Sequence, residues 1–335
     1  MSGHGRLAPK GGRTMSRLSL AKDIMVTNLV TVAPEDDVLR GIRLLLSRRI
    51  TGAPVIGNDR QYLGMLSEGS CMRVLFLTAR EAGKAGQPLP RARDFMARKL
   101  LTLRPETDAI AAISVLLKNR FAGASVVDED RNFLGVFSEH YIMRLLVNSA
   151  YEQVPSTRVE AFMNTDRGRL IDEETGVLEI AQIFLDTHFR RLPVLRDGKL
   201  VGQVSRRDVL SAEDDLARLV KGRRQALLDH RHGRILGDVW QSDGEPTTTE
   251  ISHFMDTSTE TIEEDLDFLA IAQIFLSSIR RLLPVLREGK LIGQISRRDL
   301  LLKVLDLLSH QPYHGQPGLY LSAVMGPGAE NPHLR

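Results

Sequence analysis

The strongest constraint on how this chain folds is an internal duplication in its C-terminal half. Residues 180–210 and 271–301 align without a gap at an offset of 91, and 22 of the 31 aligned residues are identical. A weaker pair of copies lies earlier, at an offset of 71. Its matching residues are Met25, Thr31, Pro34, Gly52, Gly64 and Ser67 with Met96, Thr102, Pro105, Gly123, Gly135 and Ser138. Because Met163 and Met255 begin the later copies in the same way, the chain contains four copies of one unit.

The first copy shows the secondary structure expected of each unit. Apolar residues recur at helical spacing after Pro34 and two acids, which predicts a helix over 36–48. Two β-type runs, 53–56 and 62–66, flank a polar turn and predict a hairpin, and the later copies carry Asp-Gly and Glu-Gly where a positive φ is needed. The fold class is therefore α+β or α/β, with four β-α-β-β-α repeats. Since such a unit is marginally stable alone, we expect two pseudo-symmetric pairs.

The repeats are separated by segments of different composition. Between the third and fourth repeats lies an insertion in which Glu213–Arg231 is charged with scattered apolar residues, which predicts an exposed helix that either extends the unit or contacts a partner. The predicted division is 1–17 disordered tail, 20–82 repeat 1, 91–149 repeat 2, 158–213 repeat 3, 214–250 insertion and loop, 251–308 repeat 4 and 309–335 C-terminal tail.

Composition excludes several classes of function. The formal charge of +3 is nearly balanced and does not favour nucleic-acid binding, and no apolar run is long enough to span a membrane. A single cysteine, Cys71, excludes an internal disulfide and fits a buried hydrophobe in a reducing cytoplasm. The histidines form no ligand set, and no catalytic motif occurs, so neither a metal site nor an enzyme is expected.

The duplicated stretch ends in a motif with a specific chemistry. Ser205 and Ser296 each follow a predicted strand and begin a helix, where a hydroxyl and backbone N–H groups favour phosphate. Three residues later, Asp208 and Asp299 lie on the same helix face, and a carboxylate suits the two donor hydroxyls of a ribose. The same residues also fit a simpler role as a helix cap with a first-turn acid.

Paired arginines lie inside this motif in both copies. Guanidinium groups make charge-assisted contacts with phosphate, although paired arginines are also common on solvated surfaces. The candidates are Arg206, Arg207, Arg297 and Arg298.

With Gly-x-x-Ser-x-x-Asp at 202–208 and 293–299, the repeat resembles the cystathionine beta-synthase (CBS) domain across all four units. The resemblance implies that two repeats form a Bateman module, with adenosine-type ligands in clefts between the sheets. It also implies a base pocket formed by the entering strand and the start of the hairpin. In this chain those residues are Leu170, Ile171, Arg191, Pro193, Thr261, Ile262, Leu282 and Pro284.

The first two repeats depart from the motif. Ser70 and Tyr141 stand where the acid is expected, and Glu68 and Glu139 replace the first arginine and are expected to repel phosphate. Repeats 1 and 2 therefore have a structural role, bind a different ligand or leave their clefts empty, and we favour the structural role.

These observations predict a non-catalytic cytoplasmic sensor. AMP, ADP or ATP, with S-adenosylmethionine as a further candidate, is expected in the cleft between repeats 3 and 4, and binding is expected to change contact with an unidentified protein partner. The alternatives are a constitutive scaffold, a subunit similar to the gamma subunit of AMP-activated protein kinase, and a nucleotide-processing enzyme. The oligomeric state stays open, a homodimer included.

Overall fold

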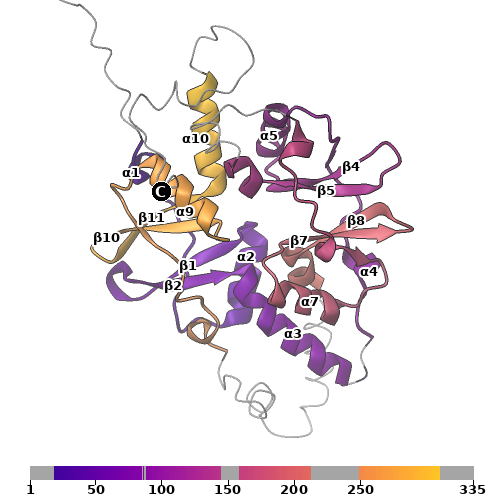
Figure 1. The fold of residues 1–335 in the computed structure, drawn as a ribbon. Helices are drawn as coiled ribbons and strands as arrows, with labels where there is room; N and C mark the ends of the chain where they lie inside the picture. The colour runs from indigo at the N-terminus through magenta and orange to yellow at the C-terminus, as the bar shows by residue number, and fades with distance from the viewer. Residues whose placement is uncertain (1–18, 85, 87, 145–157, 213–248, 310–335) are drawn as a thin grey trace, which may run out of the picture.

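A computed structural model describes residues 19–84, 86, 88–144, 158–212 and 249–309. The expected insertion helix, Glu213–Arg231, and the tails 1–17 and 310–335 lie outside these residues. Ser309, the first residue of the predicted C-terminal tail, is the last residue of a helix. Figure 1 shows four units, with repeats 1 and 4 on one side of the molecule and repeats 2 and 3 on the other. Each unit contains an antiparallel hairpin flanked by helices.

Every repeat contains a helix followed by an antiparallel hairpin, and in repeats 2, 3 and 4 a short strand precedes that helix. Repeat 1 contains α1 (Ala21–Ile24), α2 (Val38–Arg48), β1 (Gly52–Ile56), β2 (Tyr62–Ser67) and α3 (Glu68–Lys84). Repeat 2 contains α4 (Ala92–Phe95), β3 (Thr102–Leu103), α5 (Ala109–Lys118), β4 (Gly123–Val127) and β5 (Phe133–Ser138). Repeat 3 contains β6 (Ile171–Asp172), α7 (Val177–Asp186), β7 (Arg191–Arg196) and β8 (Lys199–Ser205). Repeat 4 contains β9 (Ile262–Glu263), α9 (Phe268–Ser277), β10 (Leu282–Arg287), β11 (Lys290–Ser296) and α10 (Arg297–Ser309).

The strand order confirms the β-α-β-β-α unit. In repeats 2, 3 and 4 a two-residue strand pairs in parallel with the first hairpin strand, and repeat 1 has an isolated parallel bridge between Val32 and Val55 in its place. The tight turns at Asp197-Gly198 and Glu288-Gly289 have positive φ at both residues, as expected. Helix α2, predicted over 36–48, begins two residues later, at Val38. Asp37 caps it by accepting the Arg40 N–H at 3.0 Å.

Each repeat begins with a segment that packs on another repeat. The first segment of repeat 1 bridges to repeat 4 through Leu20–Asp267 and Val26–Gln294, and that of repeat 4 bridges to repeat 1 through Met65–Asp256. Repeats 2 and 3 exchange segments in the same way. The two pseudo-symmetric pairs are therefore 1 with 4 and 2 with 3. A pairing of repeat 3 with repeat 4, on which the expected cleft depended, is wrong.

Each exchanged segment places a methionine against a glycine of its partner repeat. A Cβ atom at Gly202 would lie 2.3 Å from the Met96 sulfur, and one at Gly293 would lie 2.5 Å from that of Met25. Met163 lies against Gly135 and Met255 against Gly64 in the same manner. The glycines that recur in all four repeats are thus required by close approach of another segment.

Two hydrophobic cores join the pairs to each other. One combines buried residues of repeats 2 and 4, including Phe137 and Phe275, and the other combines those of repeats 1 and 3, including Leu75 and Phe184. Cys71 is buried in the second core, as expected. Since each repeat exchanges a segment with one neighbour and shares a core with another, the four repeats form a closed ring.

The exchange predicts that serine substitutions at two glycines have very different effects on the free energy of unfolding. In Gly135→Ser the new side chain would lie 2.8 Å from the carbonyl oxygen of Asn164 and 3.0 Å from the Met163 sulfur, so we expect a loss of about 1–3 kcal/mol in the free energy of unfolding. Gly176→Ser is the matched control, because nothing lies within 4 Å of a Cβ there and serine suits the helix start at that position. Urea unfolding measures both, and equal stabilities would contradict the exchange.

Candidate functional site

The two Ser-x-x-Asp motifs adopt one geometry. The Asp208 carboxylate accepts hydrogen bonds from the Ser205 backbone N–H at 2.7 Å and from its hydroxyl at 2.6 Å. Asp299 accepts the same pair from Ser296 at 2.8 and 2.6 Å. Each serine therefore caps the start of a helix, and the acid in the first turn is held by the serine through one carboxylate oxygen, Oδ2. Each exchanged pair of repeats contains one such acid, Asp208 in pair 2–3 and Asp299 in pair 1–4.

The first arginine of each motif closes the end of a neighbouring helix. Arg206 donates to the carbonyl oxygens of Phe184 and Thr187, both at 3.0 Å, at the end of α7. Arg297 donates to those of Phe275 and Ser278 at the end of α9. These guanidinium groups satisfy carbonyls that a helix leaves open, so the contact of Arg206 and Arg297 with phosphate stays a prediction.

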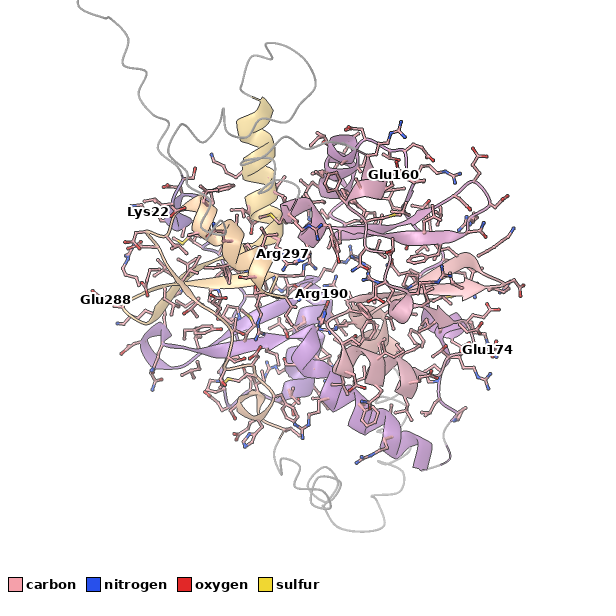
Figure 2. All side chains as sticks on the ribbon, in the orientation of Figure 1. Lys22, Glu160, Glu174, Arg190, Glu288 and Arg297 are labelled. Carbon is pink, nitrogen blue, oxygen red and sulfur yellow. The ribbon has the colours of Figure 1, made fainter. Side chains whose placement is uncertain are left out.

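A central cavity of about 650 Å³ lies where the four repeats meet. Ser205 of repeat 3 and Ser296 with Asp299 of repeat 4 open into it. Arginines from every repeat line it, namely Arg49, Arg120, Arg190, Arg191, Arg207, Arg281 and Arg298. In Figure 2, Arg190 and Arg297 lie near the middle of the molecule, whereas Glu160, Glu174 and Glu288 lie at its periphery. The cavity is strongly positive and suited to phosphate groups.

The two glutamates of the early repeats each hold one of these arginines. Glu68 accepts from Arg207 at 2.9 Å, and Glu139, whose side chain is 5% exposed, accepts from Arg281 at 2.6 Å. They were expected to repel phosphate, but their charge is compensated by the late repeats. Each ion pair joins repeats that share a core, 1 with 3 and 2 with 4.

Crowding of like charges raises the electrostatic energy of this arginine cluster. Burial lowers the pKa of Arg190 well below its usual value, and the charges of Arg281 and Arg206 lower it further. Burial also lowers the pKa of Arg191, and burial together with Arg281 lowers that of Arg297 to about 10. Buried cations that lie close together favour an anionic ligand, which stabilises their charged form.

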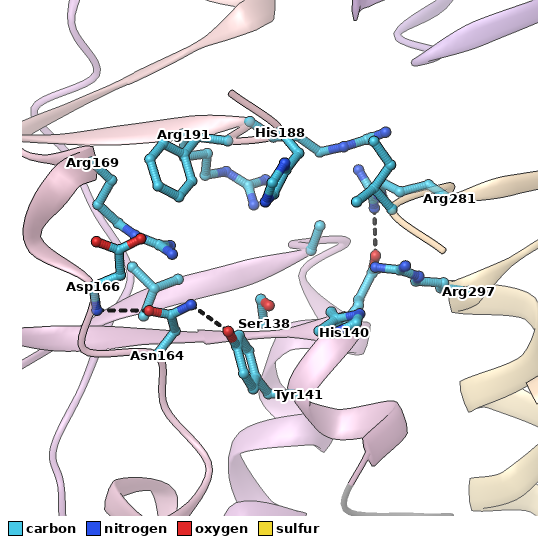
Figure 3. Close-up of a pocket in the computed structure, with 16 residues that line it drawn as sticks. Ser138, His140, Tyr141, Asn164, Asp166, Arg169, His188, Arg191, Arg281 and Arg297 are labelled. Carbon is cyan, nitrogen blue, oxygen red and sulfur yellow. Dashed lines mark hydrogen bonds and ion pairs between the residues drawn. The ribbon is translucent and has the colours of Figure 1, made fainter. Parts of the chain in front are cut away.

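Two further pockets flank the central cavity and are related by the pseudo-symmetry. One, of about 290 Å³, contains Tyr141 and Asn164 of pair 2–3, and the other, of about 620 Å³, contains Ser70 and Asp256 of pair 1–4. Figure 3 shows the first, with Arg169, Arg191 and His188 on one side and Ser138, Tyr141 and Asn164 on the other. These are the clefts of the early repeats, where Tyr141 and Ser70 replace the acid.

The expected base-pocket residues are only partly brought together. Arg191 and Leu282 line the central cavity, as do Ser205, Arg207, Ser296, Arg298 and Asp299, whereas Ile171 and Ile262 belong to the hydrophobic cores. Pro193 and Pro284 lie within strands, opposite Gln203 and Gln294, and Leu170 and Thr261 lie just before β6 and β9. A role in base binding stays a prediction for all of them.

Sequence reasoning missed Arg190 and Arg281, which lie at the centre of the site. The signal was available, because both residues directly precede the hairpin and align at the 91-residue offset. Arg49 and Arg120 likewise align at the offset of 71. A recurring arginine before each hairpin was thus visible, but only the fold shows that all four side chains converge.

Within the described ranges, no group of three His, Cys, Asp or Glu side chains is placed to hold a metal ion. None of the helices in the same part of the chain is long and apolar enough to cross a membrane.

Comparison with known proteins gives one family and several relatives. The model of the CBS domain matches residues 21–77, 92–148, 159–215 and 251–306. The chain is 32% identical over 146 residues to the chloroplastic protein CBSX1 of Arabidopsis thaliana, an alignment that covers 36% of this chain and 62% of CBSX1. It is 23% identical over 219 residues to the uncharacterized protein MJ1225 of Methanocaldococcus jannaschii, covering 62% of this chain and 68% of that protein.

Among solved structures, a crystal structure of CBSX2 of Arabidopsis thaliana in complex with AMP is 27% identical. It covers 38% of this chain and 98% of that one, with a TM-score of 0.34.

The ion pair of Glu139 generates a stability prediction. In Glu139→Gln, Arg281 loses its counter-ion beside other arginines, so we expect the free energy of unfolding to fall by about 2–3 kcal/mol. This is less than for a fully buried pair, because the Arg281 side chain is 21% exposed. Added sulfate should restore part of the lost free energy of unfolding, because it can act as a counter-ion for Arg281. Glu160→Gln, which removes an exposed partner of Arg158, is the control and should change stability little. Equal effects in thermal unfolding would contradict a buried charge cluster.

Proposed function

Since four CBS domains account for most of this chain, which therefore belongs to the CBS domain family, we propose that it is a non-catalytic regulatory protein that binds adenine nucleotides. The observation that carries the proposal is the arrangement around the central cavity. A Ser-x-x-Asp motif opens there among arginines of all four repeats. The complex of the relative CBSX2 with AMP supports the choice of ligand class.

The nucleotide would lie with its ribose at the acid and its phosphate toward the arginines. At Asp299, Oδ2 is used by Ser296, which leaves Oδ1 to accept a ribose hydroxyl. Arg298 lines the same cavity and has a buried Nη1 atom with no partner among the described residues. A phosphate at this point would satisfy a donor that is costly to leave unpaired.

We further propose two nucleotide sites, one in each exchanged pair. Asp208 and Asp299 have the same local geometry, and Ser205 and Ser296 open into the same cavity. Two bound phosphates would therefore share the central arginines, and their binding would change the charge balance between the pairs. This is the step through which occupancy could alter contact with a protein partner.

Titration calorimetry with AMP tests the two sites. We expect two molecules bound per chain, one in Asp299→Asn or Asp208→Asn, and none in the double variant. Each substitution keeps a cap acceptor but removes the charge that holds the diol, and should weaken its site about 10-fold or more. ADP, ATP and S-adenosylmethionine are compared in the same assay. If no adenosine compound binds, the protein is better described as a constitutive scaffold.

Two control variants concern the early repeats. Tyr141→Phe and Ser70→Ala alter the positions where the acid is absent, so AMP binding should equal that of the unaltered protein. A loss of AMP binding in either variant, with the melting temperature unchanged, would contradict the assignment of the sites to Asp208 and Asp299.

A further inference from the structure

The pocket of Figure 3, here called the Tyr141 pocket, contains hydrogen-bond donors in excess. Asn164 donates its amide N–H to the Tyr141 hydroxyl oxygen, so the hydroxyl proton is directed away from Asn164. The Asn164 carbonyl oxygen is already used by the Asp166 backbone N–H at 2.7 Å. Tyr141, which stands where the acid is expected, therefore offers a donor to a ligand in place of a carboxylate acceptor.

The lining of this pocket contains five arginines and two carboxylates, Asp166 and Glu139, and Glu139 pairs with Arg281. Among the described residues, the guanidinium groups of Arg169, Arg190 and Arg191 have no hydrogen-bond or ion-pair partner. Arg169 is 9% exposed, lies 4.6 Å over the ring of Phe189 and has a buried, unsatisfied Nε atom. Burial is the main cause that lowers the pKa of each of the three. Such groups require an anion close by if they are to stay buried and charged.

The pseudo-symmetric Ser70 pocket shows what a compensated site looks like. At the position of Asn164 it has Asp256, which forms an ion pair with Arg280 and accepts from the Ser258 hydroxyl at 2.7 Å. The Ser70 hydroxyl is tied to the Ser67 carbonyl at 3.0 Å. In the Tyr141 pocket an amide, Asn164, stands in place of this acid and Phe189 in place of Arg280, whereas Arg169 is an additional cation of this pocket.

From this contrast we propose that the Tyr141 pocket binds a compact oxyanion of the phosphate type, such as a pyrophosphate group, without a nucleoside. Its lining is rich in donors, as such an anion requires, and its volume of about 290 Å³ is less than half that of the central cavity. The inference concerns a site separate from the two nucleotide sites. It assigns a ligand to repeat 2, for which a structural role was favoured.

The experiment titrates inorganic pyrophosphate into the full chain with AMP present at saturation, so that the central cavity is occupied. Arg169→Gln should weaken pyrophosphate binding about 10-fold or more, because Arg169 lines this pocket and not the central cavity. Tyr141→Phe should weaken it about 3-fold or more by removing one donor, with the ring and the fold kept. The AMP stoichiometry should stay unchanged in both.

Two matched variants locate the bound anion. Arg73→Gln alters the Ser70 pocket and Arg298→Gln the central cavity, and pyrophosphate should bind both as it binds the unaltered protein. The proposal is overturned if Arg169→Gln and Tyr141→Phe bind pyrophosphate normally, or if Arg298→Gln alone abolishes binding. If AMP itself does not bind, the proposed nucleotide function fails, and the same titration without AMP still tests the Tyr141 pocket.

Discussion

The contact between a methionine and a glycine, repeated four times, is the constraint on which this structure depends. Each methionine belongs to the first segment of one repeat, and each glycine lies in a hairpin strand of another. An unbranched, polarizable side chain can fill the narrow space above a residue without a Cβ atom. Backbone bridges then fix the exchanged segment on its partner repeat. The two cores connect the resulting pairs into a ring.

Closing the ring brings arginines of four repeats to one place, and this creates both the site and its energetic problem. Glu68 and Glu139 compensate two of them and at the same time join repeats that share a core. The others remain crowded, which is why burial and like charge lower several arginine pKa values. Arg190 lines the central cavity and both flanking pockets, so an anion in one of these spaces changes the electrostatic environment of the other two.

Local features of the fold could be predicted from the sequence, because each depends on a few neighbouring residues. Such features include the β-α-β-β-α unit and the positive-φ turns. They also include the helix that starts after the serine at the end of each second hairpin strand. The pairing could not be predicted in the same way. Repeats 1 and 2 resemble each other, as do 3 and 4, yet each pair joins one early repeat with one late repeat. The similarity within each half of the chain suggests pairs 1–2 and 3–4, whereas complementarity between the folded surfaces decides the pairing.

The interleaved pairing has a consequence for the order in which the chain can assemble during synthesis. Repeats 2 and 3, with the segments they exchange, are contained in residues 91–212, so their contacts can form as soon as this stretch has left the ribosome. The first segment of repeat 1 must wait for repeat 4, since Leu20 pairs with Asp267, although the rest of repeat 1 shares its core with repeat 3. The inner pair is thus nested within the outer one, and the earliest part of the chain is the last to be buried.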